Sequence, residues 1–194
     1  MTKNVLICGV GGQGTVLAAK VLSQAALSKG KPVLSAETIG MAQRGGSVTS
    51  HVRIGKNAFS PLIPKGRADI IIAFEAAEAV RNIAFLKKGG TVVVNKKIVQ
   101  PTTASILGKS FDAQEMLDYL DALKAKVICV DAEKISARLG SSKAVNMILL
   151  GAASRTGLVS KEEILSALKS LVKPEFFALN QKAVEEGARG GQDQ

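Results

Sequence analysis

Segments dominated by apolar residues alternate along this chain with helix-like segments, and glycine or polar residues separate them. Three apolar segments have the pattern of strands that are covered on both faces of a sheet: residues 5–8, 68–74 and 91–95. Shorter apolar segments at 32–36 and 127–130 predict two further strands. Helix-like spacing of apolar residues is found in the segments between and after them: residues 15–29, 76–86, 116–123, 142–155, 160–171 and a last helix from Pro174.

One segment has a period of two. Its odd and even positions differ in character, with Val48, Ser50, Val52 and Ile54 on one face and Thr49, His51 and Arg53 on the other. Side chains alternate between the faces of a strand, so this pattern is typical of a strand with one face in water. We therefore expect residues 47–55 to form a half-exposed strand that lies apart from the buried parallel core.

Helix boundaries are marked by short polar motifs. Asp112 with Glu115, and Ser160 with Glu163, have the spacing of a capping box, in which two side chains bond to each other's backbone N–H groups. Gly157 predicts the end of the helix that precedes the second box. The helices should begin and end at these positions.

Strands that alternate with helices predict an α/β fold, with a Rossmann-like, mostly parallel sheet between two layers of helices. The alternating segment at 47–55 and its neighbour should make the sheet mixed. The chain has no internal repeat and no linker-like stretch, so we expect a single domain over residues 1–187 and a frayed tail over 188–194.

The composition limits the partners of the chain. Its 194 residues carry a formal net charge of +10, which favours anionic partners such as phosphates, coenzyme tails or acidic proteins. Nucleic acid is not expected, because the basic residues are spread from Lys3 to Arg189 and only seven aromatic residues are available for stacking. The apolar segments are too short to span a membrane or to form a secretory signal, so a cytoplasmic protein is expected.

Cys8 and Cys129 both lie in predicted strands, which favours two buried free thiols. Neither belongs to a C-x-x-C motif, so the chain should hold no iron–sulfur cluster by itself, and we predict no metal site. A Cys8–His51 nucleophile pair is an alternative that would require Cys8 to face a pocket. For His51 a structural role on a partly exposed strand face is the simpler interpretation.

The first strand leads into a glycine turn, Gly9-Val10-Gly11-Gly12-Gln13-Gly14, and then into a helix. The spacing G-x-G-x-x-G lets the backbone turn sharply and approach a ligand, and the helix N-terminus favours an anion. In a nicotinamide-binding protein an acidic residue about 20 positions later holds the ribose, and Glu37 fits that place. A self-sufficient NAD(P)-binding protein is therefore one hypothesis.

A second loop, residues 41–47, combines glycines with one amide, Gln43, and one fixed cation, Arg44. Such a loop is suited to contacts with a ligand or another chain, because Arg44 can pair with a carboxylate or phosphate. The alternative is a plain turn with Arg44 in water.

Together these residues resemble a known family. The resemblance rests on five stretches: 9–14, 41–53, 60–64, 68–70 and 146–152. The chain is similar over about residues 3–185 to the gamma components of 2-oxoacid:ferredoxin oxidoreductases, and within them most similar to the small subunits of indolepyruvate oxidoreductases. The two loops together are specific to this family.

The resemblance implies a subunit, inactive alone, of an enzyme that oxidatively decarboxylates 2-oxoacids such as pyruvate or indolepyruvate. Thiamine diphosphate, [4Fe-4S] clusters and coenzyme A would act in the complex, with ferredoxin as electron acceptor. The partner subunits would hold the thiamine diphosphate and the clusters. Whether the isolated chain forms a homodimer stays open.

On this reading the chain carries no catalytic residue by itself, and its loops bind a cofactor or a partner. The candidate residues are Gly9, Gly11, Gly12, Gln13 and Gly14 in the first loop, Met41, Gln43, Arg44, Gly45 and Gly46 in the second, and His51 on the strand that follows.

Overall fold

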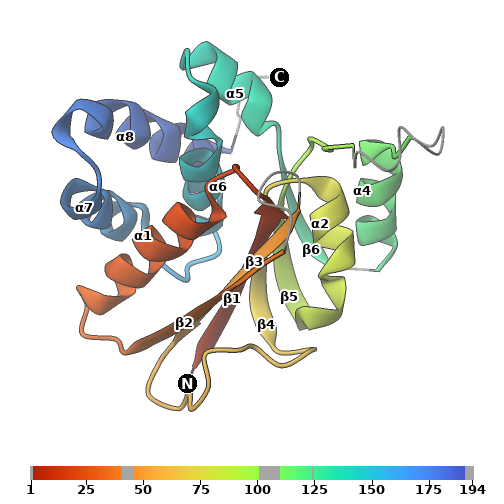
Figure 1. Cartoon of the computed structure of the whole chain (residues 1–194), viewed down its shortest axis with the longest axis horizontal. Helices are drawn as coiled ribbons and strands as arrows, with labels where there is room; N and C mark the ends of the chain where they lie inside the picture. The colour runs from red at the N-terminus through yellow and green to blue at the C-terminus, as the bar shows by residue number, and fades with distance from the viewer. Residues whose placement is uncertain (1, 41–45, 101–109, 124, 191–194) are drawn as a thin grey trace.

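The computed structural model describes residues 2–40, 46–100, 110–123 and 125–190 (Figure 1). Six strands form one sheet: β1 (Lys3–Val10), β2 (Val33–Ile39), β3 (Ser47–Ile54), β4 (Ala68–Ala73), β5 (Leu86–Asn95) and β6 (Lys126–Val130). Within the described ranges the α-helices are α1 (Thr15–Leu27), α2 (Ala76–Arg81), α4 (Ala113–Ala122), α5 (Ala132–Arg138), α6 (Val145–Ser154), α7 (Lys161–Leu171) and α8 (Pro174–Arg189). Two 3-10 turns, η1 (Ile83–Phe85) and η2 (Ser142–Ala144), complete these elements.

The strands lie in the order β2-β3-β1-β4-β5-β6. Strands β1, β4, β5 and β6 are parallel, and β3 is antiparallel to both of its neighbours. The predicted α/β fold with a mixed, mostly parallel sheet is confirmed. The strand at 47–55 makes the sheet mixed, as expected, but the expectation that one of its faces is exposed is wrong, because β3 is mostly buried. Its outer face is covered as well, and His51 is therefore only 6% exposed.

Helices cover both faces of the sheet (Figure 1). One layer contains α1 and α5–α8, and the other contains α2 and α4. The side chains of β1 alternate between the two cores: Val5 and Ile7 pack under the first layer, Leu6 and Cys8 under the second. This is why β1 is apolar at every position from Val5 to Cys8, although Lys3 and Asn4 at its start are polar, and the strand predicted at 5–8 is confirmed.

Several helix boundaries follow the sequence signals. At the start of α7 the Ser160 hydroxyl accepts from the N–H of Glu163, whose carboxylate accepts from the N–H of Ser160, so this capping box is confirmed. Asp112 caps α4 differently, because its carboxylate accepts from the N–H of Gln114 at 2.8 Å and no reciprocal bond is found among the described residues. Gly157 has φ +74°, which fits its predicted place after a helix.

Other boundaries differ from the prediction. The short helix α5, capped by Asp131, was not expected, and the helix predicted over 76–86 divides into α2, η1 and the start of β5. α8 continues to Arg189, so residues 188 and 189 are helical where a frayed tail was predicted. These short elements have too few apolar positions to show a period in the sequence.

The two cysteines are free, as expected, but only Cys8 is buried. Cys129 is exposed, which corrects the expectation of two buried thiols. The reason is topological: β6 is the last strand of the sheet, so one of its edges has no neighbouring strand. Among the described residues no helix is long and apolar enough to cross a membrane.

Candidate functional site

The carboxyl ends of the parallel strands meet at one edge of the sheet. From this edge α1, which follows β1, passes to one face, and α2, which follows the adjacent strand β4, passes to the other. Such a switch point leaves a crevice outside the strand ends, where open α/β sheets bind their ligands. The glycine turn lies at this point, directly after β1.

The first loop holds its shape by its own contacts. The side-chain oxygen of Gln13 accepts from the N–H of Val10 at 2.8 Å, and the N–H of Gln13 donates to the oxygen of Val10 at 3.2 Å. Gly12 and Gly14 have φ +97° and +85°, a region that favours glycine. Gly14 is also the N-cap of α1 and has no side chain to bond the first N–H groups of the helix.

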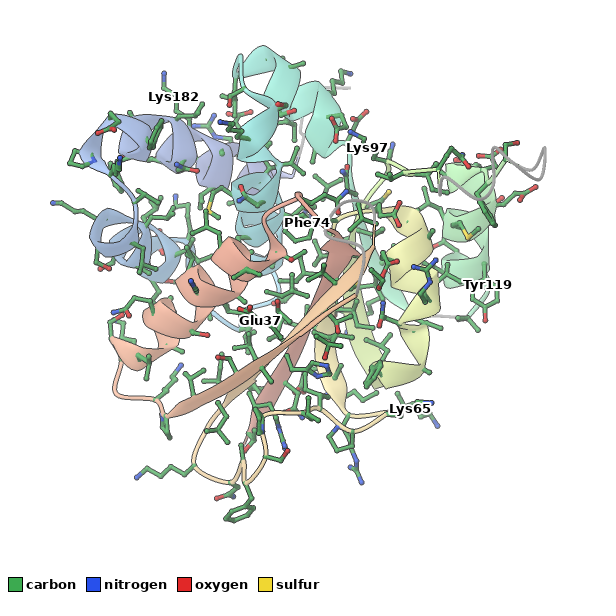
Figure 2. The ribbon with its side chains drawn as sticks, in the orientation of Figure 1. Glu37, Lys65, Phe74, Lys97, Tyr119 and Lys182 are labelled. Carbon is green, nitrogen blue, oxygen red and sulfur yellow. The ribbon has the colours of Figure 1, made fainter. Side chains whose placement is uncertain are left out.

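Gly9 is needed for a different reason. A Cβ at this position would lie 2.5 Å from the amide oxygen of Gln13 and 2.9 Å from the Cβ of Phe74, at the end of β4. Figure 2 shows Phe74 at this end of the sheet. A glycine therefore lets the loop close against β4, while open space surrounds the corresponding point at Gly12.

The two loops predicted from sequence are brought together. The N–H of Gly11 donates to the oxygen of Gly46 at 2.9 Å, so the first loop is bonded to the end of the second. The N–H of Gly40 donates to the oxygen of Ser47 at 3.1 Å and closes the base of the second loop. The remaining candidates of that loop lie outside the described residues: Met41, Gln43, Arg44 and Gly45.

A buried carboxylate lies behind this junction. Glu78 in α2 is fully buried, and its carboxylate accepts from the hydroxyl of Ser47 at 2.6 Å and pairs with the guanidinium of Arg81. The amide of Asn82 donates to the same carboxylate at 3.3 Å. Glu78 thereby connects α2 to the residue that ends the second loop.

A second buried carboxylate, Glu75, precedes α2. It accepts from the N–H of Val99 at 2.6 Å, and burial raises its pKa above the usual range. Next to it, Asn95 at the end of β5 donates to the oxygen of Phe74 at 3.2 Å and accepts from the N–H of Ala132 at 3.2 Å. These bonds fix the ends of β4, β5 and α5 relative to one another.

Sequence reasoning missed both glutamates. A signal was present, because two acidic residues follow the apolar strand at 68–74 within four positions, at the carboxyl end of a parallel strand.

His51 lies in the middle of β3, opposite Leu6 of β1. Its Nδ1 accepts from the N–H of Ile63 at 3.1 Å and its ring packs edge-on against Phe85, while burial lowers its pKa. The thiol of Cys8 contacts the main-chain oxygen of Glu78 at 3.5 Å, and burial raises its pKa. A thiol with a raised pKa is a poor nucleophile, which argues against the Cys8–His51 pair.

Comparison with known proteins shows the family of this chain. The sequence matches the family described as pyruvate ferredoxin/flavodoxin oxidoreductase over residues 4–190. The chain belongs to this family. Among its relatives is the indolepyruvate oxidoreductase subunit IorB of Thermococcus kodakarensis, which is 36% identical over 98% of this chain and 96% of that protein.

Solved structures related to the pyruvate ferredoxin/flavodoxin oxidoreductase family share the fold. The gamma subunit of a keto/oxoacid ferredoxin oxidoreductase from Geobacter sulfurreducens has a TM-score of 0.71, at 24% identity over 97% of both chains. A 2-oxoglutarate:ferredoxin oxidoreductase from Magnetococcus marinus, with 2-oxoglutarate, coenzyme A and succinyl-CoA bound, has a TM-score of 0.75 at 19% identity. The structural match extends over 97% of this chain and 31% of that longer chain.

Family membership does not support the nicotinamide hypothesis, and the sheet order gives a physical reason. Glu37 is an exposed residue of β2, and β3 lies between β2 and β1. In the dinucleotide-binding arrangement the acidic residue ends the strand next to the glycine turn, whereas here it is one strand, about 4.8 Å, further away. Figure 2 shows Glu37 on the β2 side of the sheet, beneath α1.

Proposed function

We propose that this chain is the gamma-type subunit of a 2-oxoacid:ferredoxin oxidoreductase complex and borders the active site of a larger, cofactor-bearing partner. The observation that carries the proposal is the bond between Gly11 and Gly46, which joins the two family loops at the switch point of the sheet. This main-chain bond fixes the first loop to the described end of the second, and a partner subunit can close against that junction.

The residues of this chain suit some of the complex's cofactors and not others. A [4Fe-4S] cluster needs four ligands, usually thiolates, and the two cysteines lie on different strands, one of them buried. The clusters therefore belong to the partner in this proposal, as does thiamine diphosphate, which supplies the carbanion chemistry of decarboxylation.

The first loop is suited to an anionic group, such as a phosphate of coenzyme A. Among the described residues, the N-terminus of α1 has no side-chain cap and nothing lies within 4 Å of a Cβ at Gly12, and the first turn of α1 holds no acidic residue. The N–H groups of this turn and the positive end of the helix dipole favour a phosphate there. In the proposal this chain binds and orients the acyl acceptor and performs no bond cleavage itself.

The proposed substrate is indolepyruvate or another arylpyruvate. The support is the 36% identity with IorB of Thermococcus kodakarensis, whose name states that substrate. Pyruvate is the competing substrate, because it gives the family its description.

The test is reconstitution. The purified chain should be colourless and inactive with any 2-oxoacid and a viologen acceptor, and addition of the thiamine-diphosphate-binding subunit should produce turnover. With the reconstituted complex, kcat/KM for indolepyruvate should exceed that for pyruvate. Turnover by the isolated chain would refute the subunit proposal, and a preference for pyruvate would refute only the choice of substrate.

A further inference from the structure

The loop of residues 56–66, between β3 and β4, presents bare apolar side chains to solvent. Phe59 is 95% exposed and Leu62 is 52% exposed. The loop lies at the edge of the sheet opposite the glycine turn, beside the N-terminus (Figure 1). Since β1 has eight residues, the two edges are roughly 23 Å apart, so this loop is separate from the candidate site.

Side chains of β3 hold this loop in place. The guanidinium of Arg53 donates to the main-chain oxygens of Ser60 at 2.8 Å and Leu62 at 3.3 Å. Nδ1 of His51 accepts from the N–H of Ile63, whose side chain is buried in the core. Through these contacts His51 and Arg53 anchor the loop to β3.

An exposed aromatic side chain on an anchored loop is the usual form of a binding hot spot. Large aromatic residues dominate the energy of protein interfaces, and a preformed backbone reduces the entropy lost on binding. A loop that only connected two strands would gain nothing from Phe59 in water, where its apolar surface is unfavourable.

The surroundings of the loop are basic. Residues 1–68 contain nine Lys and Arg and a single acidic residue, Glu37. Their net charge of +8 makes up most of the net charge of +10 of the whole chain. Lys65 lies at the loop's end of the sheet, away from Phe74 (Figure 2). A cavity of about 450 Å³ next to the loop is lined by three lysines and by no acidic residue: Lys3, Lys31 and Lys56.

The charge and shape of this surface indicate which kind of partner binds it. A second copy of this chain, related by a two-fold axis, would bring two equally basic surfaces together, which is repulsive. A flat anionic membrane could contact Phe59 but could not fill a concave cavity. A protein with a projecting acidic segment fits both features.

We propose that the 56–66 loop is the docking element for an acidic surface of the larger subunit of the complex. Phe59 and Leu62 enter an apolar depression on that subunit, and its carboxylates enter the cavity lined by the three lysines. This inference rests on the proposed function, because it presupposes that the larger subunit binds this chain.

The experiment measures binding of the purified chain to the immobilised larger subunit. Phe59→Ala should weaken binding about 30-fold, as expected for a central aromatic anchor, mainly through faster dissociation. The control is Phe176→Ala. Phe176 is an exposed phenylalanine too, at 53%, but it lies on α8, so this variant should bind within twofold of wild type. Both variants should melt within about 1 °C of wild type, because both side chains are exposed.

Charge is tested separately. Lys56→Glu should slow association about tenfold in 50 mM salt, and the difference should shrink in 500 mM salt as the charges are screened. Lys182→Glu is the control, because Lys182 is exposed on α8, far from the loop (Figure 2). Its association rate should equal that of wild type.

The outcomes separate this inference from the proposed function. If the Phe59→Ala chain binds and supports turnover like wild type, the docking inference is overturned and the subunit proposal stands. It is also overturned if Phe59 proves necessary only for a homodimer in sedimentation, or only for binding to vesicles of 30% phosphatidylserine in phosphatidylcholine. If the wild-type chain neither binds the larger subunit nor restores turnover, both proposals fail.

Discussion

The contact between Glu78 and Ser47 allows a quantitative prediction. Glu78 is fully buried and accepts bonds from Ser47, Arg81 and Asn82, so its charge is held by three donors. Glu78→Gln keeps the shape of the side chain but removes the charge. The guanidinium of Arg81 then loses its partner, and the bond from Ser47 loses its charge-assisted strength.

The size of the effect follows from burial. A hydrogen bond to a charged group contributes about 1.5–3 kcal/mol. Half of the Arg81 side chain is exposed, which screens the ion pair, so we expect Glu78→Gln to lower the free energy of unfolding by about 2 kcal/mol. For a domain of this length that corresponds to a fall in Tm of about 4–8 °C.

Urea and thermal denaturation of the isolated chain measure this effect. The control is the same substitution at an exposed pair, Glu133→Gln, because Lys97 and Glu133 are 3.2 Å apart with side chains 45% and 40% exposed. It should cost about 0–1 kcal/mol. A double-mutant cycle with Ser47→Ala should give a coupling energy of about 1 kcal/mol between Ser47 and Glu78. If Glu78→Gln costs no more than Glu133→Gln, or the coupling is zero, the reasoning about this junction is wrong.

Three further predictions concern the predicted site residues. Gly14→Ala should lower the stability by about 1–3 kcal/mol from its positive φ alone. It should cost more than Gly12→Ala, because a Cβ at Gly14 would lie 2.7 Å from the amide nitrogen of Asn146, whereas no described atom lies within 4 Å of a Cβ at Gly12. Equal losses in denaturation would contradict this. Burial lowers the pKa of His51, so the contribution of the neutral imidazole to stability is complete above about pH 6.5 and is lost as the pH falls toward the folded-state pKa. The Tm measured between pH 7.5 and 5.5 should therefore fall less steeply in His51→Gln than in wild type. Parallel pH profiles of the two proteins would refute this prediction. Arg44→Ala should leave the Tm of the isolated chain unchanged but reduce turnover of the complex at least tenfold, about 1.4 kcal/mol; normal turnover would return Arg44 to the interpretation of a solvated turn.

Local patterns in the sequence are enough to predict the architecture and the glycine turn after β1. The uninterrupted apolar segments predicted buried strands because a strand covered on both faces has no polar side, and the spacing of the glycines predicted a turn that only residues without a Cβ can make. Gly12 and Gly14 indeed have positive φ. The capping box at Ser160 was readable for the same reason, since all its bonds are local in the chain.

The charge distribution is also present in the sequence. Basic residues are spread along the chain, yet the acidic residues are almost absent before Asp69, and that absence leaves the 56–66 loop in a basic region. A count of Lys and Arg alone does not show this asymmetry.

Which distant residues meet is evident from the folded chain alone. The alternating pattern of β3 predicted an exposed face, but Ile63 and Phe85 cover His51, and the place of β3 between β2 and β1 moves Glu37 away from the glycine turn. The bonds from Gly11 to Gly46 and from Ser47 to Glu78 join residues more than 30 positions apart. Local pattern reflects the preferences of neighbouring residues, whereas strand order and these contacts depend on how complete elements pack, and this is why the candidate site emerged only from the fold.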